Sequence, residues 1–188
     1  MPARKHWFPK PYADLVSRLR VPAGFVMVAA FGYFSVPTRE SLMLGIPISL
    51  GGLALRAWAA GHLRKNQKLA TSGPYAFTRN PLYLGTLITA LGLAAAGDCA
   101  SLGLLFASLF LLVYLPAIEL EEQHLTAILP DYAAYAERVP LLVPTLPVNG
   151  LGPDSFSFAQ YRKNREYEAL GGWLLSAGWL VTRTFGHW

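Results

Sequence analysis

The chain has 188 residues, of which 53% are hydrophobic and only 14% are charged, with a formal net charge of +5 at pH 7. A soluble domain of this length usually carries fewer apolar and more charged residues, so the composition predicts a membrane protein. The positive charges are divided among separate segments instead of lying on one face, which argues against nucleic-acid binding.

Four apolar runs follow one another along the chain, at 21–36, 42–60, 82–96 and 100–118. Each is close to the roughly 20 residues that a helix needs to cross about 30 Å of hydrocarbon, although the first and third are short. Backbone polar groups must be satisfied inside a bilayer, and the Leu, Ala and Gly content favours helices over a barrel. The sequence therefore predicts an all-α, polytopic membrane protein with about four transmembrane helices.

Glycines in and after the second run predict close contacts between helices, because small residues let membrane helices approach each other. They are Gly45, Gly51, Gly52 and Gly61.

Basic residues alternate between the two ends of these runs. Only Arg39 lies between the first and second runs, and the third and fourth are joined by Gly97-Asp98-Cys99 alone. The other ends carry Arg4, Lys5, Lys10, Arg18 and Arg20; Arg64, Lys65, Lys68 and Arg79; and Arg138, Arg162, Lys163, Arg165 and Arg183. By the positive-inside rule, both termini and the 61–81 loop are predicted to lie in the cytosol.

The composition changes after Pro147. The apolar stretch 173–181 is too short to span a bilayer, and the tryptophans at 173, 179 and 188 favour the membrane interface. We expect this tail to lie on the cytosolic surface, where it would cover a site or contact another subunit. The sequence leaves the oligomeric state open.

The short connection at 97–99 makes the third and fourth runs an antiparallel helical hairpin. Its two open ends, GPYAFTRNPLY and IELEEQH, therefore return to the same membrane face, although about 40 residues separate them in the sequence. The chain thus predicts that two polar clusters lie side by side.

The first cluster is more than a helix start. Pro81 fits the first turn of a helix, where its missing N–H costs nothing, and Asn80 then occupies the N-cap position. Capping leaves Tyr75, Arg79 and Tyr83 unexplained. Because helix N-termini also attract anions, the cluster is a candidate ligand site.

The second cluster contains Glu119, Glu121 and Glu122, which a solvated continuation of the helix would explain. Arg79 on the facing end of the hairpin favours a site instead, since an Arg facing carboxylates beside aromatic rings can hold a zwitterionic or cationic ligand. His124 is either a base or an interfacial hydrogen-bonding residue. Arg56, near the cytosolic end of the second run, either reaches toward headgroups or contacts substrate.

These residues carry a resemblance to a known family. LATSGPYAFTRNPLYLG, followed after one hairpin by ELEEQHLTAILPDYAAYAERVP, resembles the isoprenylcysteine carboxyl methyltransferase family and its phospholipid methyltransferase relatives. The resemblance covers about residues 67–147. The matching positions are Gly73, Tyr75, Arg79, Asn80, Pro81, Tyr83, Gly85, Glu121, Glu122, Tyr132, Tyr135, Arg138, Val139 and Pro140.

The resemblance implies an integral membrane methyltransferase that uses S-adenosyl-L-methionine and a lipophilic methyl acceptor, with a cytosolic C-terminal catalytic region. It implies catalytic positions at Arg79 and at Glu121 or Glu122. It also implies cofactor-binding positions at Gln67, Leu69, Ala70, Gly73, Tyr75, Asn80, Pro81, Leu82 and Tyr83. No metal is expected, because the histidines at 6, 62, 124 and 187 are scattered.

Two departures from the family pattern concern the acceptor. Some prenylcysteine enzymes place an Arg shortly before the acidic pair, where this chain has 115–118, LPAI. Asn80 stands where these enzymes often have His. The assignment of a carboxylate as the methyl acceptor is therefore less secure. A phospholipid amine and a small thiol are alternative acceptors. A membrane reductase using NADPH and a non-catalytic membrane scaffold are more remote alternatives.

Three regions result: an N-terminal segment with two membrane helices at 1–60, a catalytic core with the hairpin at 61–148, and an interfacial tail at 149–188.

Overall fold

The computed structural model describes residues 8–65, 67–147 and 151–186, and within them every regular element is helical. The predictions that concern Arg4, Lys5, His6, His187 and Trp188, and the boundary between residues 148 and 149, lie outside the described residues. The elements are α1 (Lys10–Phe34), α2 (Arg39–His62), the 3₁₀ turn η1 (Gly73–Ala76), α3 (Pro81–Ala96), α4 (Ala100–Leu109), the π-helical turn η2 (Phe110–Tyr114), α5 (Leu115–Ile128), α6 (Tyr132–Arg138), α7 (Phe158–Lys163) and α8 (Tyr167–Phe185).

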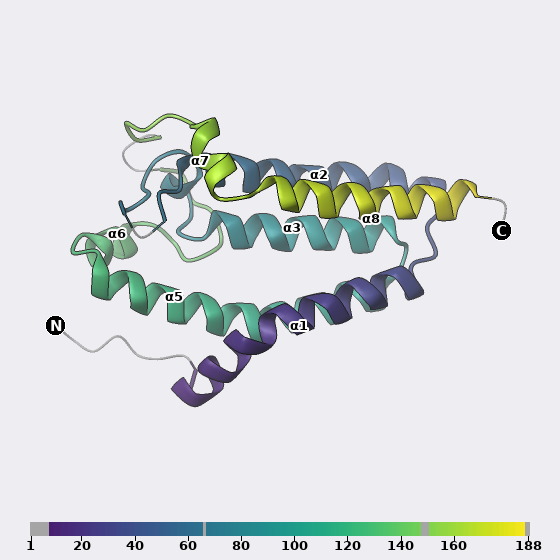
Figure 1. Ribbon diagram of the computed structural model, residues 1–188, viewed down its shortest axis with the longest axis horizontal. Helices are drawn as coiled ribbons and strands as arrows, with labels where there is room; N and C mark the ends of the chain where they lie inside the picture. Colours follow the sequence, from purple (N-terminus) through teal and green to yellow (C-terminus); the bar gives the residue numbers. More distant parts are fainter. Residues whose placement is uncertain (1–7, 66, 148–150, 187–188) are drawn as a thin grey trace.

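The long helices form a bundle in which α2, α3 and α8 lie side by side, and α1 lies along α4 and α5 (Figure 1). The segments α4, η2 and α5 run as one continuous helix from Ala100 to Ile128. The turn between α3 and α4 is as short as predicted, with Asp98 at a φ of 48°. The predicted helical hairpin is therefore confirmed.

Two of the described helices are long and apolar enough to cross a membrane, Arg39–His62 and Ala100–Ile128. The other two predicted spans correspond to shorter apolar helices, Pro22–Phe34 and Pro81–Ala96. The helical fold class is confirmed, whereas the four-span topology stays a prediction.

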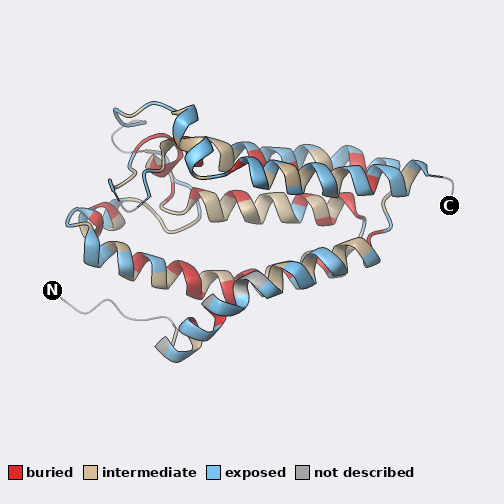
Figure 2. Cartoon of the chain, viewed as in Figure 1, coloured by how far each residue is buried: buried red, intermediate tan, exposed pale blue. Residues whose placement is uncertain are grey.

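The bundle buries small residues and exposes large apolar ones. Ala59, Ala60 and Ala96 are completely buried, whereas Phe25 and Met43 are 73% and 78% exposed. Figure 2 shows exposed and half-buried residues along the outer sides of the long helices. Large apolar side chains directed outward, with small ones between helices, are what a lipid environment favours.

Helices α2 and α3 are in direct backbone contact at two of the four predicted glycines. A Cβ on Gly45 would lie 2.2 Å from the Ala96 backbone N, and one on Gly52 would lie 2.5 Å from the Thr89 backbone N. The prediction was wrong for Gly51, which faces open space, because it lies on the outer side of α2. Gly61 is close to the Phe156 ring instead of another helix.

The C-terminal segment differs from the expected surface tail. Helix α8 has 19 residues and lies lengthwise against α2, where Trp173 Nε1 donates to Ser49 Oγ at 2.9 Å. Leu180 is fully buried in a cluster with Leu42 and Ala96. The length of this helix was underestimated because only the apolar stretch 173–181 was counted. Polar residues at its end have partners in the bundle, since Arg183 Nη1 donates to Gly32 O at 3.2 Å.

The first and last described segments lie at opposite ends of the bundle (Figure 1). Phe8 N donates to Glu119 Oε2 at 3.1 Å, at the end where the hairpin is open. Thr184 near the end of α8 donates to Pro37 O at 3.5 Å, in the turn between α1 and α2. This arrangement differs from the expectation that both termini share one face, and the membrane side of each stays a prediction.

We predict that Gly45→Ala lowers the free energy of unfolding by about 1–3 kcal/mol, because the added methyl group forces α2 and α3 apart. Gly51→Ala is the matched control, since it adds the same group to the same helix in open space. Thermal unfolding in detergent measures both variants. Equal stability of the two would contradict the direct contact between α2 and α3.

Candidate active site

The two polar clusters meet at the open end of the hairpin, as predicted. Tyr83 on α3 donates its hydroxyl to Glu121 Oε2 on α5 at 3.0 Å. Arg79 Nε lies 3.0 Å from Glu122 Oε1. Segments separated by about 40 residues are thus joined by two polar contacts at one end of the bundle.

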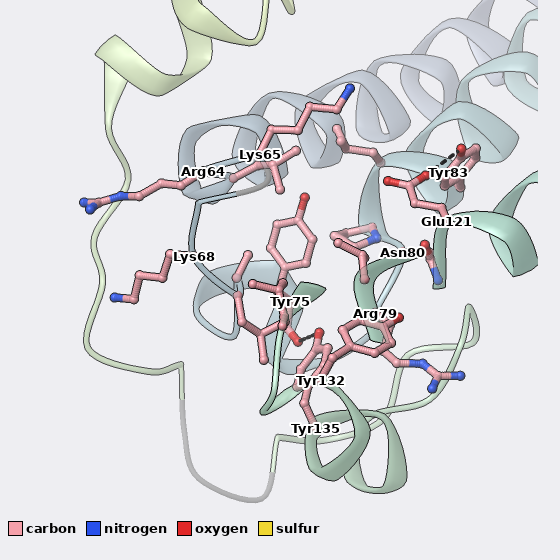
Figure 3. Close-up of a pocket in the computed structure, with 17 residues that line it drawn as sticks. Arg64, Lys65, Lys68, Tyr75, Arg79, Asn80, Tyr83, Glu121, Tyr132 and Tyr135 are labelled. Carbon is pink, nitrogen blue, oxygen red and sulfur yellow. Dashed lines mark hydrogen bonds between the residues drawn. The ribbon is translucent and has the colours of Figure 1, made fainter. Parts of the chain in front are cut away.

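A cavity of about 80 Å³ opens to solvent beside these contacts (Figure 3). Its wall is formed by the loop after α2, by η1, by the first turn of α3 and by the facing sides of α5 and α6. The lining residues are Leu63, Arg64, Lys65, Lys68, Leu69, Ala70, Tyr75, Arg79, Asn80, Pro81, Leu82, Tyr83, Glu121, Leu125, Leu129, Tyr132 and Tyr135.

Tyr75 provides a polar group directed into this cavity. Its side chain is 6% exposed, its hydroxyl points into the cavity in Figure 3, and that hydroxyl has no hydrogen-bond partner among the described residues. Burial raises the pKa of Tyr75 above its ordinary value, with further contributions from Tyr135 and Glu121. The hydroxyl therefore stays neutral at physiological pH and is available to a ligand.

The turn η1 holds Tyr75 in place. Gly73 begins it with a φ of 59°, and a Cβ there would lie 2.6 Å from His62 Nε2, so glycine is required both by its conformation and by the close contact. Tyr135 on α6 donates its hydroxyl to Tyr75 O at 2.8 Å.

Arg79 and Glu122 belong to a buried network, although both were predicted to be catalytic. The Arg79 side chain is 7% exposed and that of Glu122 is 10% exposed. Glu122 Oε1 also accepts from the Tyr132 hydroxyl at 3.0 Å, and Arg79 Nη1 donates to Ala136 O at 3.1 Å. These contacts attach α6 to the hairpin.

The two adjacent glutamates therefore have different environments. Glu121 is exposed and lines the cavity, while Glu122 is buried on another side of α5 and does not line it. The sequence left the choice between them open, and the geometry favours Glu121 as the residue available to a ligand.

Asn80 occupies the N-cap position of α3, but its side chain forms no capping hydrogen bond. Asn80 Nδ2 instead donates to Leu141 O at 3.1 Å, and Thr78 Oγ1 donates to the same carbonyl at 3.2 Å. With the bond from Arg79 N to Pro140 O at 2.9 Å, these contacts place the chain after α6 against the loop before α3.

Most of the predicted cofactor positions line the cavity, namely Leu69, Ala70, Tyr75, Asn80, Pro81, Leu82 and Tyr83. Gln67 and Gly73 do not: Gln67 is exposed, and Gly73 shapes η1. Sequence reasoning missed Leu63, Arg64, Lys65, Lys68, Leu125, Leu129, Tyr132 and Tyr135 as lining residues. The basic lining residues had been interpreted only as indicators of membrane topology. Tyr132 and Tyr135 lie three positions apart and so share one face of a helix, and this spacing could have identified them as lining residues.

The structure predicts stability effects of different size for the two glutamates. Glu122→Ala leaves the buried Arg79 guanidinium unpaired and should cost about 3–5 kcal/mol of unfolding free energy. Glu121→Ala removes an exposed carboxylate and should change stability far less. Chemical denaturation in detergent measures both, and a larger loss for Glu121→Ala would refute the buried network.

Comparisons with known proteins find sequence similarity over the part of the chain that contains most of the cavity. Residues 46–131 match the phospholipid methyltransferase family. The chain is 38% identical over 106 residues to the cobalt-zinc-cadmium resistance protein CzcN of Cupriavidus metallidurans, covering 55% of this chain and 48% of that protein. It is 34% identical over 106 residues to the nickel-cobalt-cadmium resistance protein NccN of Alcaligenes xylosoxydans xylosoxydans, with the same coverage of 55% and 48%.

A third relative carries the name of an enzyme. The chain is 28% identical over 145 residues to the protein-S-isoprenylcysteine O-methyltransferase of Schizosaccharomyces pombe, covering 73% of this chain and 61% of that protein. No solved structure matches the chain significantly. The chain spans about half the length of the two metal-resistance relatives. The family match over residues 46–131 and the methyltransferase relative confirm the resemblance to the phospholipid methyltransferase family.

Proposed function

We propose that this protein is an integral membrane methyltransferase that uses S-adenosyl-L-methionine to methylate a lipid or lipid-modified acceptor. One observation carries the proposal. Inside the family-matched segment, the neutral Tyr75 hydroxyl and the hydrogen-bonded pair of Tyr83 and Glu121 converge on one cavity at the open end of the hairpin.

The residues of the cavity fit S-adenosylmethionine, which supplies a methyl group attached to a positively charged sulfur. The Glu121 carboxylate and the tyrosine rings favour a cationic centre. The Tyr75 hydroxyl has a free hydrogen-bonding capacity. Arg64 and Lys65 on the rim add positive charge that suits the carboxylate of an amino-acid group, whereas Lys68 is paired with Asp154.

The cavity is small beside the about 300–1,000 Å³ of typical small-molecule sites. A nucleoside-sized ligand therefore fills it and extends over its open side, along the loop that contains Leu69 and Ala70.

The chain contributes alignment and charge to methyl transfer. The transfer requires that the acceptor atom, the methyl carbon and the sulfur lie in line and that water is excluded. Tyr83 fixes the orientation of Glu121, and Glu121 stabilises the positive charge at the reacting centre or accepts a proton from the acceptor. Asn80, held by Leu141 O, keeps the backbone before α3 in position.

A second cavity supports a lipophilic acceptor. It has a volume of about 210 Å³ and lies between α1, α3 and α4, with Met27, Phe31, Leu93 and Phe106 among its apolar walls. Tyr114 lines this cavity, Tyr83 lines the polar one, and their rings are in edge-to-face contact at 6.2 Å. A molecule with a polar head and an apolar chain suits two cavities that adjoin at an aromatic pair.

The residues before Glu121 and Glu122 bear on the chemical class of the methyl acceptor. Leu115–Ile118 lack the Arg that some prenylcysteine enzymes place there, and this absence favours a phospholipid amine or a thiol over a carboxylate. Isoprenylcysteine stays an alternative, supported by the Schizosaccharomyces pombe relative.

We predict that the purified protein binds S-adenosylhomocysteine in detergent and does not respond to NADPH. Tyr75→Phe, Tyr83→Phe and Glu121→Gln should each weaken this binding by about tenfold or abolish turnover. The two tyrosine variants each lose a hydroxyl, and Glu121→Gln loses the negative charge, a change worth roughly 0.5–3 kcal/mol in each case. Isothermal titration calorimetry measures the affinity.

Glu137→Gln is the matched control, because Glu137 is an exposed carboxylate on α6 that does not line the cavity. Absence of S-adenosylhomocysteine binding by the wild-type protein, or full activity of all three site variants, would overturn the proposed function.

The apolar cavity predicts a separation between cofactor and acceptor. Gly24→Leu places a side chain in this cavity and should lower labelled methyl transfer into a membrane lipid extract at least several-fold, while the affinity for S-adenosylhomocysteine stays unchanged. Gly32→Leu is the matched control, because it adds the same side chain at a position on α1 that does not line the cavity. Equal transfer by both variants would show that the cavity does not hold the acceptor.

A further inference from the structure

The sequence suggested that Arg56 reaches toward headgroups or contacts substrate, and the structure gives it different partners. Its Nε lies 2.5 Å from Glu166 Oε1, at the residue that precedes α8. The two side chains are 23% and 7% exposed, respectively. Arg56 therefore neither extends to headgroups nor lines the polar cavity; it forms a largely buried ion pair between α2 and the start of α8.

The same guanidinium also binds α3. Arg56 Nη1 donates to Thr86 Oγ1 and lies 3.4 Å from Leu82 O. Thr86 Oγ1 in turn donates to Leu82 O at 2.9 Å. One side chain thus connects the start of α8 with the first turns of α3.

Close packing restricts the position of this side chain. A Cβ on Gly85 would lie 2.6 Å from Arg56 Cγ and 2.7 Å from Gly52 O. The Arg56 stem therefore lies directly on the backbone of α3, and a shift of the guanidinium is transmitted to that backbone.

The part of α3 that Arg56 holds contains site residues. Leu82 lines the polar cavity, and its neighbour Tyr83 donates to Glu121. A small rotation of this first turn would move the Tyr83 hydroxyl away from the carboxylate, since a hydrogen bond weakens steeply with distance and angle.

We propose that Arg56 is a positioning residue: through its ion pair with Glu166 it uses α8, which lies outside the matched residues 46–131, to fix the first turn of α3 and hence Tyr83. The catalytic consequence rests on the proposed function, whereas the positioning of α3 does not. The segment after residue 131 is thereby part of the site although it contributes no lining residue beyond α6.

Glu166→Gln tests the proposal, with Glu168→Gln as the matched control two residues away. Glu168 is exposed and pairs only with the exposed Arg165 among the described residues. The readouts are hydrogen–deuterium exchange of peptides covering residues 81–86, the melting temperature, and the affinity for S-adenosylhomocysteine.

Glu166→Gln is expected to accelerate exchange selectively in residues 81–86 and to weaken S-adenosylhomocysteine binding at least fivefold, while the folded bundle is retained. Arg56→Lys keeps the charge pair but loses the fork that reaches Thr86 and Leu82, so it should give an intermediate effect on both readouts. Glu168→Gln should change neither.

A lower melting temperature with unchanged exchange in 81–86 would overturn the proposal, as would a uniform increase of exchange over the whole bundle. Should the wild-type protein fail to bind S-adenosylhomocysteine, the proposed function fails, and the exchange comparison still decides whether Arg56 positions α3.

Discussion

The buried ion pair between Arg79 and Glu122 is the contact on which the site depends. Taking both charges out of water is costly, and the hydrogen bonds from Tyr132 to Glu122 and from Arg79 to the Ala136 carbonyl offset part of that cost. This network connects the loop before α3, the end of α5 and α6. The exposed contact between Tyr83 and Glu121 joins the same two segments one residue earlier on α5.

The adjacent residues Glu121 and Glu122 differ in burial, and therefore in the role that each can have. Glu122 is turned inward, where it is saturated by its partners, while Glu121 is turned toward the cavity, where a ligand can reach it. Because successive residues on a helix point about 100° apart, one dipeptide supplies both roles. The division leaves the cavity lined by one exposed carboxylate, that of Glu121.

The helical hairpin was the most predictable part of this protein. Apolar runs and the three-residue connection at 97–99 predicted the hairpin, and the hairpin predicted that Tyr83 and the acidic pair meet. The sequence could not separate Glu121 from Glu122, because this depends on the rotation of α5 after the π-helical turn η2, which shifts the helical register. The lengthwise packing of α8 was missed because its stability comes from distant partners such as Ser49, Leu42 and Gly32.

The pairing of Arg56 with Glu166 also has a consequence for biosynthesis. These residues are 110 positions apart, so a growing polypeptide that already contains α2 and α3 still lacks the counter-charge of the Arg56 guanidinium. The counter-charge arrives only when the final helix emerges from the ribosome. If Arg56 positions α3 as proposed, the first turn of α3 is fixed late in biosynthesis, and a nascent chain interrupted before residue 166 would hold the whole family-matched segment without that constraint.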